Sequence, residues 1–269
     1  MTLPMIPPEL ASSEEAPIIM SVIKRSNDVR ETGSHCHSRG QLLGATHGLI
    51  SIDAGECRWV VPATHGVWIP PNVKHSLLGS HGPFNGWSIY VAEPACTDLP
   101  DKQCVLELSG LLREAVNRAT LWEYKELEPA QIRLANVIID EIRTMRNIPL
   151  GLPLPKDTRS LKVAMALSDN PGDDRCLEDW AVWAGVSSRT LRRLFTKETG
   201  FNFTEWRQRA RLLKSLEMLA AGKNVTTIAL DLNYENVSAF IALFRRTFGA
   251  TPGHYKNMMR GGLNNHLNP

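Results

Sequence analysis

Four side chains in the N-terminal third of the sequence could bind a metal ion or a polar ligand. His35 and His37 are separated by one residue, Gln41 follows four residues later, and His75 ends a later segment. Alternate side chains of a strand point to one face, so both imidazoles of the first pair can enter one cavity. Three interpretations stay open for this set: ligands of a divalent metal, hydrogen-bonding partners of an organic effector, and histidines with a structural role.

Three tryptophans lie in the same region, where short apolar runs predict strands. Aromatic side chains in such a region most often belong to the core, but ligand pockets are also built mainly from apolar and aromatic walls. We therefore include the tryptophans beside the histidines, expecting one or two of them to line an effector cavity. The candidate effector-binding residues are His35, His37, Gln41, Trp59, Trp68, His75 and Trp87.

A cluster of basic side chains lies in the C-terminal half, just after a predicted turn. Apolar residues have helical spacing over 177–184, Gly185 stands where a left-handed residue is usually needed, and Ser187 is suited to cap the next helix. That second helix would suit the major groove of DNA, because an arginine guanidinium can form two hydrogen bonds with guanine O6 and N7 or can bind a phosphate. The plainer alternative is a solvated basic face. The outward candidates are Ser188, Arg189, Arg192, Arg193 and Lys197.

The same helix-turn-helix plan recurs 49 residues downstream, where Phe244 matches Phe195 and Gly249 matches Gly200. A connecting helix of about 19 residues would span on the order of 28 Å at 1.5 Å per residue. That reach can place two recognition helices on one face of DNA about one turn, roughly 34 Å, apart. The repeat favours DNA binding over a solvated basic face.

The two copies together resemble the AraC/XylS family of bacterial transcription regulators over the last 110 residues. The resemblance is specific because many positions match in order across two modules. It implies binding to promoter DNA and contact with RNA polymerase. The matching positions are Ala181, Gly185, Val186, Ser187, Leu191, Arg193 and Phe195 in the first copy, then Ile228, Ala229, Tyr234, Phe240, Phe244, Arg245, Phe248, Gly249, Pro252 and Tyr255.

The resemblance assigns base reading to three arginines of the first recognition helix. The matching positions of the second helix hold short side chains, which can touch a thymine methyl or a phosphate but cannot make bidentate base contacts. We therefore expect the first helix to do most of the reading and the second to anchor the DNA backbone. The readers are Arg189, Arg192 and Arg193, the matching second-helix positions are Ser238, Ala239 and Ala242, and the anchoring candidates are Asn236, Arg245 and Arg246.

Two further positions depart from the family pattern. Asn233 stands where relatives usually have Gly before the aromatic residue, and Asn tolerates the left-handed conformation, so we expect the turn to survive. Cys176 stands where a Ser or Thr cap is more usual, and we expect it to cap its helix poorly.

The histidine segments resemble the two motifs of the cupin family, H-x-H with a later Glu and P-x-G-x-x-H, over roughly 75 residues. Gln41 stands where cupins usually have Glu, and Asn72 where they have Gly. Because Gln is a neutral and weaker ligand, the resemblance implies a sensor barrel more than a tightly held catalytic metal. A divalent metal in this domain is the one cofactor that the sequence suggests.

Charge and cysteine usage agree with a DNA-binding protein of a reducing compartment. Residues 157–269 hold 16 Lys and Arg against 11 Asp and Glu, whereas residues 1–156 hold 14 against 17. A basic C-terminal half is the expected footprint of a nucleic-acid-binding module. The five cysteines are scattered and form no C-x-x-C pair, and no leader or membrane-spanning pattern is present. We expect a cytoplasmic protein without a membrane partner.

We predict an α+β fold, in which an N-terminal cupin-like β-barrel precedes an all-α double helix-turn-helix domain. The predicted strands span 18–24, 41–46, 48–53, 58–62, 66–70, 75–78 and 87–91. The predicted divisions are a flexible N-terminus (1–16), the effector-sensing barrel (17–105), a helical connector and linker that could form a homodimer (106–155), the DNA-binding domain (156–262) with motifs at about 177–199 and 225–248, and a flexible tail (263–269).

The function predicted from these observations is a ligand-responsive transcription regulator that senses a small molecule in the barrel. Control of a neighbouring efflux or metabolic gene is our first expectation for its target. The alternative is a metal-dependent cupin oxygenase or isomerase with a helical appendage. A third hypothesis is a DNA-binding protein whose barrel is purely structural.

Overall fold

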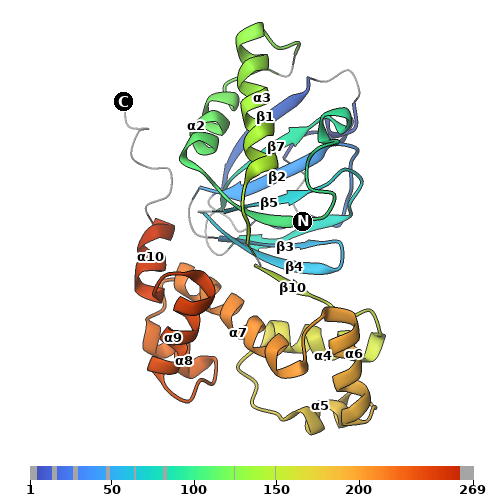
Figure 1. Cartoon of the computed structure of the whole chain (residues 1–269), viewed down its shortest axis with the longest axis vertical. Helices are drawn as coiled ribbons and strands as arrows, with labels where there is room; N and C mark the ends of the chain where they lie inside the picture. The colour runs from blue at the N-terminus through green and yellow to red at the C-terminus, as the bar shows by residue number, and fades with distance from the viewer. Residues whose placement is uncertain are drawn as a thin grey trace. The chain divides into compact units, whose positions relative to one another are not determined.

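The computed structural model describes residues 5–13, 17–26, 30–46, 49–63, 65–80, 84–123, 125–148 and 150–260. It divides into two compact units, one made mainly of residues up to 151 and the other of residues 56–58 and 152–258. The first unit holds the sheets and two of the longer helices, and the second is helical (Figure 1). The α+β prediction is confirmed at this level, with a sheet-rich N-terminal region and a helical C-terminal region.

Two sheets form the framework of the N-terminal unit. The six-stranded sheet has the order β1-β7-β2-β5-β8-β9, and the four-stranded sheet has the order β10-β4-β3-β6. The seven predicted strands are confirmed to within a few residues. The strands are β1 Ile19–Ser26, β2 Gly40–Ala45, β3 Leu49–Ala54, β4 Cys57–Pro62, β5 His65–Ile69, β6 His75–Ser80, β7 Phe84–Val91, β8 Cys104–Glu107, β9 Asn147–Ile148 and β10 Gly151–Pro153.

Three short strands were not predicted. β8 crosses the predicted boundary at residue 106 between the barrel and the helical connector, and β9 and β10 lie within the segment that we expected to be a linker. Pro153 is compatible with β10 because this strand is at a sheet edge, where a missing N–H costs no ladder bond. The Pro-rich segment therefore carries strand pairing and is not a plain linker.

Two amphipathic helices, α2 Gly110–Ala119 and α3 Pro129–Thr144, cover one face of the six-stranded sheet. Their buried residues Leu112, Ala115, Ile138 and Ile142 belong to one hydrophobic cluster with Leu42 of β2. Side chains alternate along a strand, so the neighbours of Leu42 in β2 face the opposite side of this sheet. That opposite side carries the histidine cluster.

The N-terminal segment differs from the expectation of a flexible 1–16. In its described part, residues 5–13, a short helix α1 Pro8–Ala11 forms, and Ile6 and Ala11 pack with Met20 and Tyr90. The guanidinium of Arg39 donates to the backbone oxygens of Ser13 (3.1 Å) and Pro17 (2.7 Å), which fixes the segment to the unit. The predicted flexible tail, 263–269, lies outside the described residues.

The C-terminal unit contains seven helices in its described residues, and both predicted helix-turn-helix motifs are present. Gly185, with φ 68°, ends the first turn, and Asn233, with φ 55°, occupies the equivalent turn in the second motif as predicted. The N-terminal unit also has a short 3-10 helix, η1 Glu93–Cys96, between β7 and β8. The helices are α4 Thr158–Asp169, α5 Leu177–Trp183, α6 Ser188–Thr199, α7 Phe203–Ala220, α8 Val225–Asp231, α9 Val237–Phe248 and α10 Pro252–Arg260.

Candidate DNA interface and histidine cluster

Helix α6 is held by an apolar face and presents its basic residues outward. Leu191, Leu194 and Phe195 are buried, and the Ser187 hydroxyl accepts a hydrogen bond from the Thr190 N–H at 3.2 Å. The predicted cap is therefore confirmed. The basic residues fall at spacings of three and four on the opposite face, so they share one side of the helix. The exposed basic side chains are Arg189, Arg192, Arg193 and Lys197, and Ser188 at the start of the helix is half-buried.

The arginines of α6 differ from other arginines of the unit in how their side chains are used. Within the described residues, no carboxylate or backbone carbonyl binds the guanidinium groups of Arg189, Arg192 and Arg193. By contrast, Arg175 forms an ion pair with Asp173 at 2.8 Å. An exposed guanidinium without an internal partner is available to DNA, so the structure supports the α6 arginines as contact candidates.

Helix α9 places its short side chains on an accessible face. Ser238, Ala239 and Ala242 are all exposed, as are Arg245 and Arg246. Alanine leaves no polar atom to pair with a base edge, so this face suits contact with a sugar, a methyl group or a phosphate.

Asn236 has a structural task that the sequence reasoning did not assign. Its Oδ1 accepts a hydrogen bond from the Ala239 N–H at 2.8 Å, so Asn236 is the N-cap of α9. Only its amide N–H donors remain for a phosphate at this helix N-terminus.

Cys176 was expected to cap α5 poorly, and an acidic neighbour supplies the missing function. The carboxylate of Asp179 accepts from the backbone N–H and from Sγ of Cys176, both at 3.0 Å. One of the orphan N–H groups at the start of α5 is thus satisfied by Asp179 rather than by a Ser or Thr hydroxyl.

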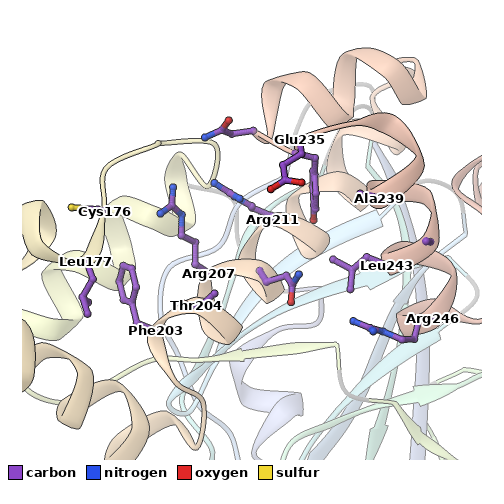
Figure 2. A pocket seen from close by; sticks show the side chains of 14 residues that line it. Cys176, Leu177, Phe203, Thr204, Arg207, Arg211, Glu235, Ala239, Leu243 and Arg246 are labelled. Atoms are coloured by element: carbon purple, nitrogen blue, oxygen red, sulfur yellow. The ribbon is translucent and has the colours of Figure 1, made fainter.

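A groove of about 750 Å³ lies between α7 and α9. Figure 2 shows Arg207 and Arg211 on α7, with Ala239, Leu243 and Arg246 on the wall formed by α9. Three arginines and one acidic residue, Glu235, line the groove. Its lining therefore carries more positive than negative side chains.

The histidine cluster is built by a backbone pairing rather than by a regular strand. His35 and His75 form an isolated antiparallel bridge, with each backbone N–H donating to the other's carbonyl at 2.9 Å. Potential ligand atoms of His35, His37 and His75 all lie within 4.8 Å of one another. The prediction that these histidines share one site is therefore supported by geometry, although only the local bridge, not a long strand, brings them together.

Each histidine of the cluster is oriented by a backbone carbonyl. Nδ1 of His35 donates to the Gly33 carbonyl at 3.0 Å. Nδ1 of His37 donates to the Arg39 carbonyl at 2.7 Å, and Nδ1 of His75 donates to the Val73 carbonyl at 2.9 Å. A carbonyl can only accept, so the hydrogen must be on Nδ1 and the Nε2 lone pair of a neutral ring is available. Nε2 of His75 is buried and has no hydrogen-bond partner among the described residues.

Burial favours the neutral form of two of these rings. Desolvation lowers the pKa of His75 to about 4 and also lowers the pKa of His37. Neutral imidazole is the form that binds metals.

Gln41 reaches the cluster from β2. Its Nε2 donates to Ser88 Oγ at 2.7 Å and to the Tyr90 hydroxyl at 3.2 Å, and its Oε1 lies 3.3 Å from Nε2 of His37. The amide oxygen thus faces the imidazoles. Asn72, with φ 63°, adopts the left-handed conformation at the position where cupins usually have Gly.

Two of the three tryptophans proposed as effector-binding residues are instead core residues. Trp68 and Trp87 belong to the cluster under α2 and α3, on the face opposite the histidines. A Cβ on Gly40 or Gly44 would lie 2.4 Å from the Trp68 ring or 2.5 Å from the Trp87 ring, so each indole fills space left by a glycine. Trp59 lies in β4 and does not line the histidine cavity.

The cavity beside the cluster is small, and its lining includes a residue that sequence reasoning missed. It measures about 30 Å³ and is lined by both sheets, with Gln41 from β2, Ile52 from β3 and His75 from β6. Arg30 also lines the cavity and is 4% exposed, so a positive charge is held close to the imidazoles. Arg30 stands alone between predicted strands, without a pattern in the sequence that would signal a site.

Comparison with known proteins agrees with this geometry. The family model described as a helix-turn-helix domain matches residues 180–258. The HTH-type transcriptional regulator NimR of Escherichia coli K12 is 34% identical over 226 residues, covering 82% of this chain and 81% of the relative. The chain belongs to the AraC family.

Two further similarities of this AraC-family chain cover a smaller share of it. RipA of Corynebacterium glutamicum, an HTH-type transcriptional regulator, is 38% identical over 103 residues, 38% of this chain and 31% of RipA. A solved regulator of Chromobacterium violaceum with an AraC-type DNA-binding domain is 25% identical, with a TM-score of 0.36, and covers 38% of this chain and 93% of that chain. The AraC-family protein is a transcription regulator that binds DNA. No helix in its described part has the length and apolar character needed to span a membrane.

Proposed function

We propose that this AraC-family regulator is ligand-responsive and that the ligand sensed by its N-terminal unit is a divalent transition-metal ion. The observation that supports this most directly is the convergence of three imidazoles whose candidate ligand atoms lie within 4.8 Å of one another. Each ring is oriented through Nδ1 by a backbone carbonyl, which is the second contact that metal-binding histidines usually make. His35, His37 and His75 would hold the ion, with Gln41 Oε1 as a weaker fourth ligand.

The size of the cavity favours an ion over an organic effector. Pockets for organic ligands usually measure about 300–1,000 Å³, whereas a single water needs roughly 10–15 Å³. The cavity of about 30 Å³ accommodates an ion with one small co-ligand. An organic effector would require the walls formed by β2, β3 and β6 to move.

In the same proposal, α6 is the main base reader and α9 anchors the DNA backbone. Arg189, Arg192 and Arg193 are exposed without internal partners in the described chain, and the short side chains of α9 cannot make bidentate base contacts. A metal changes DNA binding only if it binds the DNA-competent and incompetent states with different affinity.

The remaining parts of the proposal concern partners and location. We infer that the two sheets close into a cupin-like barrel, that the protein acts in the cytoplasm with RNA polymerase, and that it has no enzymatic activity. A second copy of the chain is the partner proposed for α2 and α3, where Leu111 and Ile132 are 56% and 43% exposed. Sedimentation of wild type and of Leu111→Glu tests this, and a monomeric wild type would contradict it.

Cobalt titration tests the metal proposal. Full-length protein freed of metal by a chelator should bind one Co²⁺ per chain and develop the visible absorption of histidine-bound cobalt. His75→Ala should lose this signal. His254→Ala, which removes an exposed histidine of α10, should retain it. A wild type without the absorption band would show that the cluster is structural.

A further inference from the structure

The loop between α4 and α5 is bound to α7 by two arginines. Arg211 Nε donates to the Pro171 carbonyl at 3.0 Å, Arg207 Nη1 donates to the Arg175 carbonyl at 2.9 Å, and Arg207 Nη2 donates to the Asp173 carbonyl. The two arginines are four residues apart, so they lie on the same face of α7. Figure 2 shows both side chains extending from α7 in the same region of the groove.

The same loop touches the second helix-turn-helix motif directly. A Cβ on Gly172 would lie 2.1 Å from the backbone oxygen of Asp231 and 3.5 Å from Cα of Leu232. The obstacle is backbone, so a larger residue could not be accommodated by a side-chain rotation. Asp231 is the last residue of α8, and the turn into α9 follows it. The lead-in to the first motif is therefore in contact with the turn of the second.

Arg211 connects both motifs through its guanidinium. In addition to its bond to Pro171, it lies 6.0 Å from the centroid of the Tyr234 ring, at the outer limit of a cation–π contact. Tyr234 packs against Phe240 of α9, with ring centroids 5.1 Å apart. One side chain of α7 thus contacts the loop before α5 and the aromatic residue that supports α9.

The loop is also attached to the core of the first motif. The Asp173 carboxylate accepts from Arg175 Nε at 3.0 Å and from Arg175 Nη2 at 2.8 Å. The Arg175 guanidinium lies 3.6 Å from the ring centroid of Trp180, which is fully buried in α5. A displacement of the loop is therefore resisted by the core of the first motif and by the turn of the second.

We propose that Gly172, Arg207 and Arg211 form an inter-motif bracket that fixes α6 and α9 relative to each other and thereby sets the spacing between DNA half-sites that this regulator accepts. The three residues are positioning residues and need not touch DNA. The inference rests on the proposed contact of both α6 and α9 with DNA. Two motifs held rigidly on one chain bind DNA at the same time only when the separation of the half-sites matches the separation of the two recognition helices.

Two variants distinguish the positioning role of the bracket from an effect of side-chain charge and from a failure to fold. Arg211→Lys keeps the positive charge but removes the planar fork that reaches Pro171 and Tyr234 together. Gly172→Ala places a methyl group against the Asp231 backbone. Gly253→Ala is the matched control, because a Cβ at this position of α10 meets no atom within 4 Å. Circular dichroism and thermal unfolding of each full-length variant identify any protein that has not folded.

The readout is affinity for duplexes that carry one half-site, or two half-sites separated by the selected spacer or by spacers one to three base pairs longer or shorter. Wild type should prefer the selected spacer by about tenfold or more. Folded Arg211→Lys and Gly172→Ala should keep half-site affinity within about twofold and lose most of the spacer preference, whereas Gly253→Ala should behave as wild type.

Variants whose affinity depends on spacer length as in wild type would overturn the proposal of an inter-motif bracket. If Gly172→Ala does not fold, Arg211→Lys alone decides the question. A wild type that binds one and two half-sites equally well would show a different failure, namely that α9 does not contact DNA, and would overturn the inference together with the two-reader proposal.

Discussion

Nε2 of His37 lies 3.3 Å from Oε1 of Gln41, and each of these atoms is an acceptor when Nδ1 of His37 donates to Arg39. A cation between or beside two such lone pairs makes the arrangement favourable, whereas two facing acceptors alone repel each other. Without a cation, rotation of the Gln41 amide would place Nε2 against the ring and relieve the repulsion. The orientation of this amide is therefore expected to follow occupancy of the site.

Gln41→Glu is the first prediction that follows from this contact. A carboxylate supplies a negative charge next to the three imidazoles, so the affinity for Co²⁺ or Zn²⁺ should rise by on the order of tenfold, about 1.4 kcal/mol. Competition with a chromophoric chelator measures the change. Gln208→Glu, on the exposed surface of α7, is the control for added charge. Equal affinities of wild type and Gln41→Glu would exclude Gln41 as a ligand.

The second prediction concerns the base readers of α6. If Arg192 and Arg193 both make bidentate contacts, the double change to Ala should remove roughly 2–6 kcal/mol of specific over non-specific binding. Footprinting and competition with random-sequence DNA measure this difference. Lys197→Ala, on the same helix, should mainly weaken binding to all sequences. Unchanged promoter selectivity in the double variant would show that the main reader lies elsewhere.

The third prediction concerns the anchoring role of α9. Arg245→Gln and Arg246→Gln should each weaken binding to specific and unrelated duplexes by similar factors. If each arginine neutralises one phosphate, its removal should make the slope of log K against log salt shallower by about 0.9. A variant that loses affinity only for the selected site would instead identify its arginine as a base reader.

The fourth prediction tests the reassignment of Trp68 from ligand site to core. Trp68 is fully buried in the cluster under α2 and α3, so Trp68→Ala should lower the free energy of unfolding by about 3–5 kcal/mol. Metal affinity of the folded fraction should change little. Leu121→Ala, at a site 73% exposed, should change the stability by less than about 0.5 kcal/mol. Urea titrations measure both, and a Trp68→Ala protein of normal stability but without ligand response would restore the original assignment.

Local patterns in the sequence were sufficient to locate the helix-turn-helix motifs of the C-terminal unit. Ser187 at the cap, Gly185 at the turn and the buried Leu191 are specified by residues close together in the chain, so spacing alone locates them. The strands of the N-terminal unit were also located by their apolar runs. Which face each strand presents depends on pairing across the sheet, and this is why Trp68 and Trp87 were placed on the wrong side.

The two histidine motifs predicted that His35 and His75 share a site, but not how they meet. The contact is a single backbone bridge between residues 40 positions apart, and a single bridge leaves no periodic signal. The task of Gly172 depends on the backbone of Asp231 in another motif, so the loop sequence alone does not show it. Arg30 enters the cavity for the same reason, because the folded sheets rather than its neighbours in sequence define its position.

The most direct test of metal-responsive DNA binding is fluorescence anisotropy of full-length protein on a duplex selected from random sequences, measured in parallel with and without Co²⁺ or Zn²⁺. Wild type should change its operator affinity by about fivefold or more when the site is filled, as coupled sites typically do. His75→Ala should change by less than about twofold. An unchanged wild-type affinity, while cobalt absorption shows that the histidine site is filled, would contradict the proposal that this site controls DNA binding.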